Sequence, residues 1–299
     1  MTALRDTRLR GRLRYGEPMA RHTSWRVGGP ADRFYVPADA DDLAAFLTTL
    51  PPDEPVHWIG LGSNLLVRDG GVRGTVIQTS GALKGLARIA PDRVRAEAGV
   101  ASAKVARFCA GENLAGAEFL AGIPGTIGGA LAMNAGAFGG EFWSLVAAVE
   151  TLDRRGARRM RPAADYTVGY RSVRAPADEW FIAAHLALTP GQSTRSRTLI
   201  KSLLARRGAT QPTQLPNAGS VFKNPPGDHA ARLIEAAGLK GERIGRACIS
   251  ELHANFIVHD GSARAADIER LIEHARATVE ARFGVRLETE VRIIGEARA

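Results

Sequence analysis

The sequence predicts an α+β protein built from more than one domain, and three observations support that prediction. The chain has 299 residues, which is more than one hydrophobic core usually organises. Short β-rich segments and amphipathic helical segments both occur along its length. The hydrophobic fraction of 45% and the charged fraction of 24% are typical of a soluble globular protein.

The first segment, residues 1–79, is predicted to combine short strands with one helix. The run "ADRFYVPAD" is expected to form a strand that ends at Pro37. A helix follows, because Asp39 or Asp41 can serve as its N-cap and Pro51 ends it. The runs "VHWIG" and "TVIQT" are expected to be strands, with "GLGSNLLVRDGG" between them.

The second segment, residues 80–190, is predicted to form strands and one amphipathic helix. The run "DRVRAEAG" is a candidate strand, and "LVAAVETLD" and "EWFIAAHLALT" have the composition of buried strands. The run "SAKVARFCAGEN" places Val105, Phe108 and Cys109 on one helical face. A glycine-rich apolar stretch, "FLAGIPGTIGGALAMNAGAFGGE", lies between these elements.

A connecting helix over residues 191–205 is expected to lead into a third segment, residues 206–299. In that segment "DHAARLIEAAGLKG" predicts a helix that ends at Gly238, and "ANFIVHD" predicts a strand. A long helix is expected to be capped by Ser262. The alternating run "VRLETEVRIIG" predicts a final strand, on which Glu288 and Glu290 would share one face.

The net charge of +9 raises the question of nucleic-acid binding. Most basic residues are arginines spread over the whole chain, and the clusters "RRGARRMR" and "ARRGA" contain no aromatic residues. We therefore expect no nucleic-acid partner. Either the arginine content is compositional, or the ligands are anionic small molecules that a positive cleft attracts.

The spacing of cysteines and histidines and the lack of long apolar runs limit the possible cellular location and metal binding of the protein. Cys109 and Cys248 are isolated, which predicts reduced, buried cysteines in a cytoplasmic protein. The basic N-terminus lacks the apolar stretch of a secretory signal, and no apolar run approaches the ~18 residues of a membrane span. The histidines, including His253, have no metal-ligand spacing, so we expect no metal site.

The motif "GLGSNLL" partly matches a dinucleotide-binding fingerprint. Gly60 and Gly62 fit that pattern, but Leu66 occupies the place of its third glycine, and a strand rather than a helix is predicted to follow. A Rossmann loop is therefore excluded. The N–H groups of Gly60, Gly62, Ser63 and Asn64 could still form a nest for phosphate oxygens, and a plain turn is the alternative.

The second glycine-rich motif, "GIPGTIGGALAMNAGAFGG", lies in a region that is otherwise apolar. Glycine inside a helix costs about 1 kcal/mol relative to alanine, so this many glycines need a physical reason. Close approach of the backbone to a flat ligand is one reason, and tight helix packing is the other. Two such loops in consecutive segments suggest one extended ligand. The glycines concerned are Gly125, Gly128, Gly129, Gly136 and Gly139.

Three other stretches contain candidate functional side chains. In "QLPNAGSVFKNP", Ser220 follows Gly219 at a predicted turn, with no histidine nearby to activate its hydroxyl. In "VGYRSVR", Tyr170 precedes Arg171, which is either a surface arginine or a bidentate clamp for a carboxylate. Glu290 is either a solvent-facing carboxylate at the end of a strand or part of a site.

Eight stretches of the chain, read together, resemble the UDP-N-acetylenolpyruvoylglucosamine reductase (UDP-N-acetylmuramate dehydrogenase) family. They occur in the order typical of that family and extend from His22 to Gly295, which makes a chance match very improbable. The stretches are "HTSWRVGGPA", "GLGSNLLVRDGGVRGTVI", "EFLAGIPGTIGGALAMNAGAFGGE", "GYRSV", "QPTQLPNAGSVFKNP", "LIEAAGLKG", "HANFIVHDG" and "FGVRLETEVRIIG".

The resemblance implies a flavoenzyme of bacterial cell-wall synthesis. Two N-terminal subdomains would bind FAD noncovalently in the vanillyl-alcohol-oxidase type of fold, and a C-terminal α+β domain would bind the sugar nucleotide. NADPH would reduce FAD, and hydride would then pass to the methylene carbon of the enolpyruvyl ether. The resemblance further implies a cytoplasmic enzyme with a small-molecule substrate and no membrane partner, and we expect a monomer.

The resemblance also assigns roles to single residues. Ser220 would donate the proton that follows hydride addition, Arg171 would pair with the substrate carboxylate, and Glu290 would act in its protonated form. Binding of FAD is implied for Gly60, Gly62, Ser63, Asn64, Leu65, Gly125, Thr126, Gly128, Gly129, Gly136 and Arg207. Contacts to the substrate are implied for Tyr170, Lys223 and Asn224.

The chain also departs from the family pattern. Leu252 stands where many members have lysine before "HANF", and the span between "GYR" and "PNAGS" is short, as in the branch without a substrate-covering insertion. One rival hypothesis is a flavin oxidase of the same cofactor fold, which would consume oxygen and would not need Ser220, Arg171 and Glu290 together. Another is a non-catalytic FAD or nucleotide sensor, which would bind the cofactor without turnover.

Overall fold

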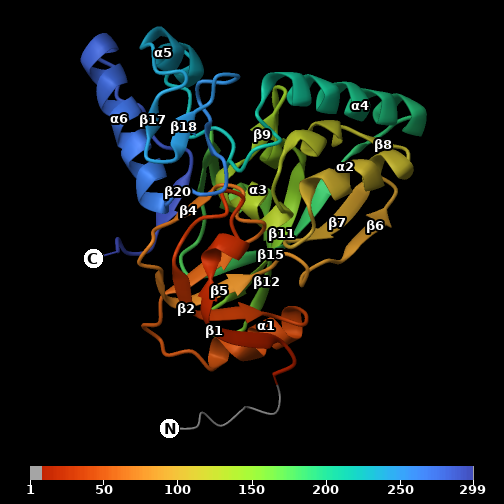
Figure 1. Cartoon of the computed structure of the whole chain (residues 1–299). Helices are drawn as coiled ribbons and strands as arrows, with labels where there is room; N and C mark the ends of the chain where they lie inside the picture. Colours follow the sequence, from red (N-terminus) through yellow and green to blue (C-terminus); the bar gives the residue numbers. More distant parts are fainter. Residues whose placement is uncertain (1–8, 299) are drawn as a thin grey trace. The chain divides into compact units, whose positions relative to one another are not determined.

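The computed structural model describes residues 9–298 (Figure 1). The chain divides into two compact units. The first unit contains the residues up to Tyr15, Arg33–Gly60 and Gly74–Leu204. The second unit contains Gly16–Asp32, Leu61–Arg73 and the residues from Ala205 onward. Helices and strands occur in both units, which confirms the predicted α+β class.

A five-stranded antiparallel sheet forms the centre of the first unit. Its strand order is β12-β11-β15-β7-β6, so strands distant in sequence are neighbours in the sheet. The three strands predicted in this segment are present as β7, β11 and β15. The bounds are β6 Leu86–Ala90, β7 Arg93–Glu97, β11 Val146–Asp153, β12 Arg158–Pro162 and β15 Glu179–Ala187.

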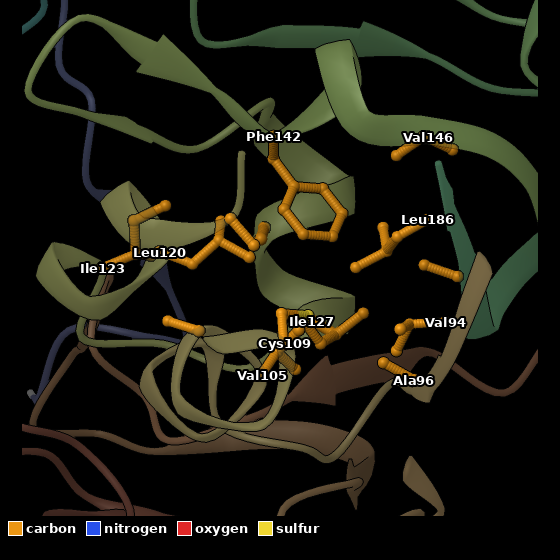
Figure 2. Packing of buried hydrophobic residues seen from close by; sticks show 14 of the residues in the cluster. Val94, Ala96, Val105, Cys109, Leu120, Ile123, Ile127, Phe142, Val146 and Leu186 are labelled. Atoms are coloured by element: carbon orange, nitrogen blue, oxygen red, sulfur yellow. The ribbon is translucent and has the colours of Figure 1, made fainter. Parts of the chain in front are cut away.

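Helices α2 (Ser102–Gly111) and α3 (Ile127–Met133) share a buried cluster with this sheet (Figure 2). The predicted amphipathic face of α2 is confirmed, since Val105 and Cys109 are fully buried and Phe108 packs against the cluster. Burial raises the pKa of the Cys109 thiol to about 12, with Glu118 adding to the effect, so this cysteine remains a neutral packing group. Cys248 is also buried and reduced.

A second sheet, with strand order β1-β2-β5-β3, carries the helix α1 (Ala40–Thr48). The carboxylate of Asp39 accepts the N–H of Asp42 at 2.9 Å, so Asp39 and not Asp41 is the N-cap. Strands β1, β2 and β5 each run across the boundary between the two units as defined above. The bounds are β1 Arg12–Pro18, β2 Pro30–Val36, β3 Val56–Ile59 and β5 Val72–Gln78.

Shorter elements complete the first unit. Helix α4 spans Ser193–Thr210, longer than the helix expected over 191–205, and its last turns belong to the second unit. The paired short strands are β8 Leu114–Ala115 with β16 Thr189–Pro190, β9 Gly136–Ala137 with β10 Gly140–Glu141, and β13 Thr167–Gly169 with β14 Ser172–Arg174. The 3-10 helices are η1 Met19–Arg21 in the second unit, and η2 Glu118–Gly122, η3 Phe142–Leu145 and η4 Ala163–Asp165 in the first.

The second unit packs two helices against short strands. Strands β17, β18 and β19 form an antiparallel sheet, and β20 pairs in parallel with β4. The indole N–H of buried Trp25 donates to the carbonyl of Ile257 at 2.8 Å, which ties an N-terminal stretch to this sheet. The bounds are β4 Leu65–Val67, α5 Ala230–Ala236, β17 Arg243–Ile244, β18 Ala247–Ile249, β19 Ile257–His259, α6 Ala265–Phe283 and β20 Arg292–Ile294.

Two predictions for the C-terminal segment were wrong. Ser262 does not cap the long helix: α6 begins at Ala265, and Asp69 accepts the N–H groups of Ala265 and Ala266 at 3.0 Å each. A carboxylate from a distant part of the chain thus takes the place of a local cap, where it also complements the helix dipole. Ser262 instead donates its hydroxyl to Asp260.

The predicted final strand over 285–295 is also broken. Thr289 makes an isolated bridge with Phe222, a bend follows at Glu290, and only Arg292–Ile294 forms a regular strand, β20. The reason is that the two parts of this run have different neighbours, since β20 pairs with β4. Glu288 and Glu290 therefore do not lie on one face of one continuous strand.

The division into units follows contacts rather than chain order. The second unit takes in Leu61–Arg73 because β4 pairs with β20. We retain the sequence-based division into residues 1–79, 80–190, 191–205 and 206–299 as a proposal. Among the residues that the structure describes, no helix combines the length and apolar character of a membrane span, and no group of acidic, histidine or cysteine side chains is arranged to hold a metal ion.

Candidate active site

A turn stabilised by side-chain hydrogen bonds precedes Ser220. Asn217 accepts the N–H of Gly219 at 3.0 Å and donates its amide N–H groups to the carbonyls of Pro212 and Leu215 at 3.1 and 2.7 Å. Gly219 has a φ of +76°, a left-handed conformation that glycine adopts without a steric penalty. The half-buried Ser220 that follows lies outside regular secondary structure. The carboxamide of Asn217 therefore sets the direction from which the chain enters this serine.

Residues 220–222, here called the serine segment, are held by a buried asparagine. The carbonyl of Asn255 accepts the N–H of Val221 at 2.9 Å. Its side chain accepts the N–H of Phe222 at 2.9 Å and donates to the carbonyl of Phe222 at 2.8 Å. Sequence reasoning missed Asn255, although it stands in the quoted stretch "HANF". A polar residue within a predicted buried strand was the available signal.

Glu290 lies next to the serine segment. The N–H of Glu290 donates to the carbonyl of Val221 at 2.8 Å, and the bridge between Phe222 and Thr289 continues this pairing. On its other side, the side-chain amide of Asn64 donates to the carbonyl of Glu290 at 3.1 Å. The second unit therefore brings together one candidate proton donor, one candidate acid and one residue of the first glycine motif.

The two candidate substrate contacts after the serine segment have partners of their own. The ammonium group of Lys223 donates to Glu288 at 2.5 Å, and Lys223 is much less exposed than this carboxylate. The side-chain oxygen of Asn224 accepts the N–H of Ala230 at 3.1 Å, the first residue of α5. Lys223, the residue directly after the serine segment, is thus paired with Glu288.

The loop that precedes β4 makes a tight turn in the second unit. Gly62 has a φ of +61°, and a Cβ atom there would lie 2.0 Å from the carbonyl oxygen of His22, so only glycine fits. The carbonyl of Gly62 accepts the N–H of Ser24 at 3.1 Å. Ser63 is half-buried in this turn, and Leu65 begins β4 and is nearly fully buried.

Arg207 lies in the last turns of α4, in the part assigned to the second unit. Its Nε donates to the side-chain oxygen of Gln211 at 3.0 Å. Burial lowers the pKa of this guanidinium relative to an ordinary arginine. A half-buried cation is a plausible partner for an anionic ligand group, because the loss of hydration strengthens its attraction to such a group.

In the first unit, Arg171 occupies the turn of the β13–β14 hairpin. Its φ of +51° is uncommon for a residue with a side chain and carries some strain, which is typical of functional positions. The guanidinium lies over the ring of Tyr170, 5.1 Å from the ring centroid, and donates to the carbonyls of Asn134 and Gly136 at 3.3 and 3.0 Å. Half-exposed Tyr170 precedes it in the same turn.

Asn134 organises the surroundings of this hairpin and was also missed. Its side chain donates to Glu141 at 2.9 Å and to the carbonyl of Gly169 at 3.1 Å, and it accepts the N–H of Trp143 at 3.1 Å. Gly136 follows two residues later, where a Cβ atom would lie 2.9 Å from the Arg171 guanidinium. Glycine at 136 therefore allows the guanidinium to approach the backbone.

The two glycine-rich motifs meet within the first unit. A Cβ atom on Gly60 would lie 2.2 Å from the hydroxyl oxygen of Thr126, so the bare Cα of this glycine faces that hydroxyl. Among the residues that the structure describes, four buried side-chain groups lack a hydrogen-bond partner: the hydroxyls of Thr126, Ser102 and Tyr166 and the indole N–H of Trp58. The carbonyl of Gly125 accepts the N–H of Ser102 at 2.9 Å. The Thr126 hydroxyl, an unsatisfied buried donor beside Gly60, suits a ligand that provides an acceptor oxygen.

The remaining glycines of the second motif differ from one another. The N–H of Gly128 donates to the carbonyl of Ala98 at 2.9 Å, and a Cβ atom on Gly128 would lie 3.0 Å from that of Ala98, so this glycine permits tight packing. Gly129 is exposed, with open space around its Cα. Close packing therefore accounts for Gly128, whereas Gly129 leaves backbone accessible.

Two family models match the chain. The FAD binding domain matches residues 31–159, and the UDP-N-acetylenolpyruvoylglucosamine reductase C-terminal domain matches residues 211–294. The first match contains Gly60, Thr126 and Asn134. The second contains the serine segment, Asn255 and Glu290.

Close relatives and a solved structure carry the same description. The chain is 61% identical to a UDP-N-acetylenolpyruvoylglucosamine reductase of Alkalilimnicola ehrlichii, over 97% of each chain. It is also 61% identical to that of Methylococcus capsulatus, over 95% of this chain and 93% of the relative. The crystal structure of the Thermus caldophilus reductase is similar with a TM-score of 0.79 and 32% identity, covering 95% of this chain and 99% of that one.

Proposed function

Because the chain belongs to the UDP-N-acetylenolpyruvoylglucosamine reductase family, we propose that it reduces the enolpyruvyl ether of UDP-N-acetylglucosamine-enolpyruvate to UDP-N-acetylmuramate with electrons from NADPH. Membership makes the chain an oxidoreductase of peptidoglycan synthesis that acts on a CH–CH bond and has an FAD-binding domain of the predicted fold type. We propose a cytoplasmic location, which its free, buried cysteines support, and a monomeric state.

Residues of the two glycine-rich motifs fit FAD. The unsatisfied hydroxyls of Thr126 and Ser102 can donate to phosphate oxygens, and the bare Cα of Gly60 packs directly against the Thr126 hydroxyl, where a side chain would not fit. We assign the cofactor to Gly60, Gly62, Ser63, Asn64, Leu65, Gly125, Thr126, Gly128, Gly129, Gly136 and Arg207. FAD, when bound, supplies hydride transfer from the nicotinamide to the methylene carbon of the enolpyruvyl group.

Ser220 then has to supply a proton. Hydride addition to the methylene carbon leaves negative charge on the neighbouring carbon and its carboxylate, and that carbon must be protonated on one face. The Ser220 hydroxyl donates this proton and recovers one from solvent. A serine hydroxyl is a weak acid, but it is adequate against so basic a carbanion and needs no histidine.

Arg171 and Glu290 stabilise the developing charge. The planar guanidinium of Arg171 can take the substrate carboxylate in a bidentate pair, and its contact with Tyr170 and two carbonyls supports a defined orientation. Glu290 acts as a protonated acid, because a carboxylate would repel the enolate-like charge. Tyr170, Lys223 and Asn224 bind the sugar nucleotide, with the Lys223 ammonium suited to its phosphates.

One observation carries this proposal: the hydrogen bond from the Glu290 N–H to the Val221 carbonyl, next to Ser220. This bond joins the backbone segments that carry Ser220 and Glu290, which are distant in sequence. Each of the two side chains is suited to a different part of the same proton transfer. An oxidase of the same cofactor fold would not need them together, because it adds no proton to carbon.

The test is an anaerobic absorbance titration of the purified protein. The flavin band is expected to bleach with NADPH and to return only when the enolpyruvyl sugar nucleotide is added. Recovery only with oxygen would indicate an oxidase instead. Cofactor binding without bleaching by NADPH would indicate a sensor, and a protein that takes up no FAD would refute the reading of both glycine motifs.

A further inference from the structure

Asn255 pairs with the backbone of Phe222 as a neighbouring strand would. Its side-chain oxygen accepts the N–H of Phe222 at 2.9 Å, and its side-chain nitrogen donates to the carbonyl of the same residue at 2.8 Å. Asn255 is only 4% exposed, so neither bond competes with bulk water. Both polar groups of one residue in the serine segment therefore depend on a single side chain.

The main chain of Asn255 holds the same segment. Its carbonyl accepts the N–H of Val221 at 2.9 Å, and its own N–H donates to the ring nitrogen Nδ1 of His253 at 3.2 Å. Burial lowers the pKa of His253, which keeps its ring neutral at physiological pH and leaves Nδ1 able to accept this bond. His253 also packs edge-on against Phe256.

The position of the Ser220 hydroxyl depends on this backbone. Serine has one side-chain torsion angle, so for a given rotamer the position of its Oγ follows the backbone of residues 219–221. The N-terminal side of that backbone is held by Asn217, and the C-terminal side by Asn255. Without the Asn255 side chain, the N–H and C=O of buried Phe222 would lose these partners, and the segment would shift to find others.

We propose that Asn255 is the positioning residue for the proton donor Ser220, and that it acts on proton transfer without touching the substrate. The inference rests on the proposed function, since it requires Ser220 to supply the proton. It predicts a selective effect: flavin reduction by NADPH does not use Ser220, whereas reoxidation by the enolpyruvyl substrate does.

The experiment measures the two half-reactions of Asn255→Asp and Asn255→Ala by stopped-flow absorbance. Asn255→Asp keeps the volume and the acceptor oxygen but places an oxygen opposite the Phe222 carbonyl. It therefore tests the two hydrogen bonds to Phe222 even if Asn255→Ala does not fold. Flavin reduction by NADPH is expected to stay within about twofold of wild type. Reoxidation is expected to slow at least tenfold, with a larger solvent deuterium isotope effect because proton delivery limits the rate.

Ser250→Ala is the matched control. Ser250 is buried in the same connection between β18 and β19, and its hydroxyl oxygen accepts the N–H groups of Leu252 and His253 at 3.2 and 3.4 Å, both within its own loop. Loss of the Ser250 hydroxyl perturbs this loop without removing the two hydrogen bonds between Asn255 and Phe222. Both half-reactions of Ser250→Ala are expected within twofold of wild type.

A double-mutant cycle separates positioning from general destabilisation. If Asn255 acts through Ser220, Asn255→Asp slows reoxidation less than twofold in the Ser220→Ala background. Two results would overturn the role of Asn255 and leave that of Ser220 intact. One is that Asn255→Asp still slows reoxidation tenfold in the Ser220→Ala background. The other is that Asn255→Asp in the wild-type background reoxidises as fast as Ser250→Ala. If Ser220→Ala alone reoxidises at the wild-type rate, the proposed role of Ser220 fails, and with it the role of Asn255.

Discussion

The carbonyl oxygen of Val221 accepts the backbone N–H of Glu290 at 2.8 Å, so the residue after Ser220 is bound directly to the C-terminal glutamate. The same carbonyl lies 3.3 Å from the N–H of Val291, and Asn64 donates to the Glu290 carbonyl from the opposite side. The backbone of Glu290 is thus held on both its N–H and its C=O. A shift of either element would move the proposed acid and the proposed proton donor relative to each other.

Replacing Ser220 by alanine should separate the two halves of the reaction. Flavin reduction by NADPH should remain at the wild-type rate, because no proton from Ser220 is used there. Reoxidation by the enolpyruvyl substrate should slow by more than tenfold, and each factor of ten corresponds to about 1.4 kcal/mol in the barrier. Stopped-flow absorbance measures both rates. Ser262→Ala, an exposed serine of the same unit, serves as the control, and a loss below tenfold would show that another group donates the proton.

Glu290→Gln should be milder than Glu290→Ala, because the amide of glutamine can still donate a hydrogen bond to the developing charge while alanine cannot. The measurement is kcat with saturating substrate. Glu288→Gln is the control: its carboxylate is exposed and forms an ion pair with Lys223, a contact of a kind usually worth 0–1 kcal/mol. Equal losses for the two Glu290 variants would contradict a role as a protonated acid.

Arg171→Lys should reduce kcat/KM by at least tenfold, because an ammonium group cannot form the two parallel hydrogen bonds that a guanidinium makes with a carboxylate. Lysine would also lose the paired contacts to Asn134 and Gly136. Steady-state kinetics with the enolpyruvyl substrate measure the effect. Arg174→Lys, at the exposed end of the same hairpin, should have wild-type kinetics. Wild-type behaviour of Arg171→Lys would remove this residue from the site.

Thr126→Val should have opposite effects on stability and on cofactor binding. In the protein without FAD, valine removes a buried hydroxyl that lacks a partner, a group that costs about 1–3 kcal/mol, so the free energy of unfolding should stay equal or rise. FAD affinity should fall, because a donor to the cofactor is lost. Fluorescence titration of the apoprotein with FAD and denaturant unfolding measure the two quantities.

Thr151→Val provides the comparison for Thr126. Thr151 is equally buried, but its hydroxyl donates to Glu179 at 2.8 Å. Its replacement should destabilise the protein by about 1 kcal/mol and leave FAD affinity unchanged. If Thr126→Val lowers stability as Thr151→Val does and leaves FAD affinity unchanged, the hydroxyl of Thr126 has no role toward the cofactor.

Stability should depend on Glu150 below about pH 4.5. Hydrogen bonds from Arg95 lower the pKa of Glu150 to about 2; burial opposes this shift, and a hydrogen bond with His185 supports it. Because the folded pKa lies below the ordinary value of 4.5, the stabilisation is fully present above about pH 4.5 and is lost as pH falls toward 2. It amounts to about 3 kcal/mol at neutral pH.

Denaturant unfolding of wild type and Glu150→Gln at several pH values tests this linkage. The difference in unfolding free energy should fall from about 3 kcal/mol at neutral pH to less than half of that near pH 3. A difference independent of pH would mean that ionisation of Glu150 does not contribute. Arg95 also pairs with Glu97 at 3.0 Å, so this residual contact remains in both proteins.

Elements with local signals were predictable. The cap and the proline stop of α1, the apolar face of α2 and the strands β7, β11 and β15 depend on residues close together in sequence. Predictions were wrong where a distant group took over a local role. Asp69 caps α6 in place of Ser262, and pairing of β20 with β4 breaks the alternating C-terminal run.

The candidate site divides in the same way. The resemblance of their motifs to a family made Ser220, Arg171 and Glu290 candidates, but nothing in those motifs indicated what holds them. Asn255 and Asn134 act on backbone groups far along the chain, and an asparagine that pairs with a distant carbonyl has no periodic signature.

The amino-acid sequence by itself determined the fold class, the local helices and strands, and the residue types available for hydride and proton chemistry. Only the tertiary structure decided which of them are neighbours. It placed the Glu290 N–H on the Val221 carbonyl, the Asn255 amide on Phe222 and the Thr126 hydroxyl beside Gly60. The physical reason is that periodicity and capping act over a few residues, whereas hydrogen bonds between distant segments depend on how the whole chain folds.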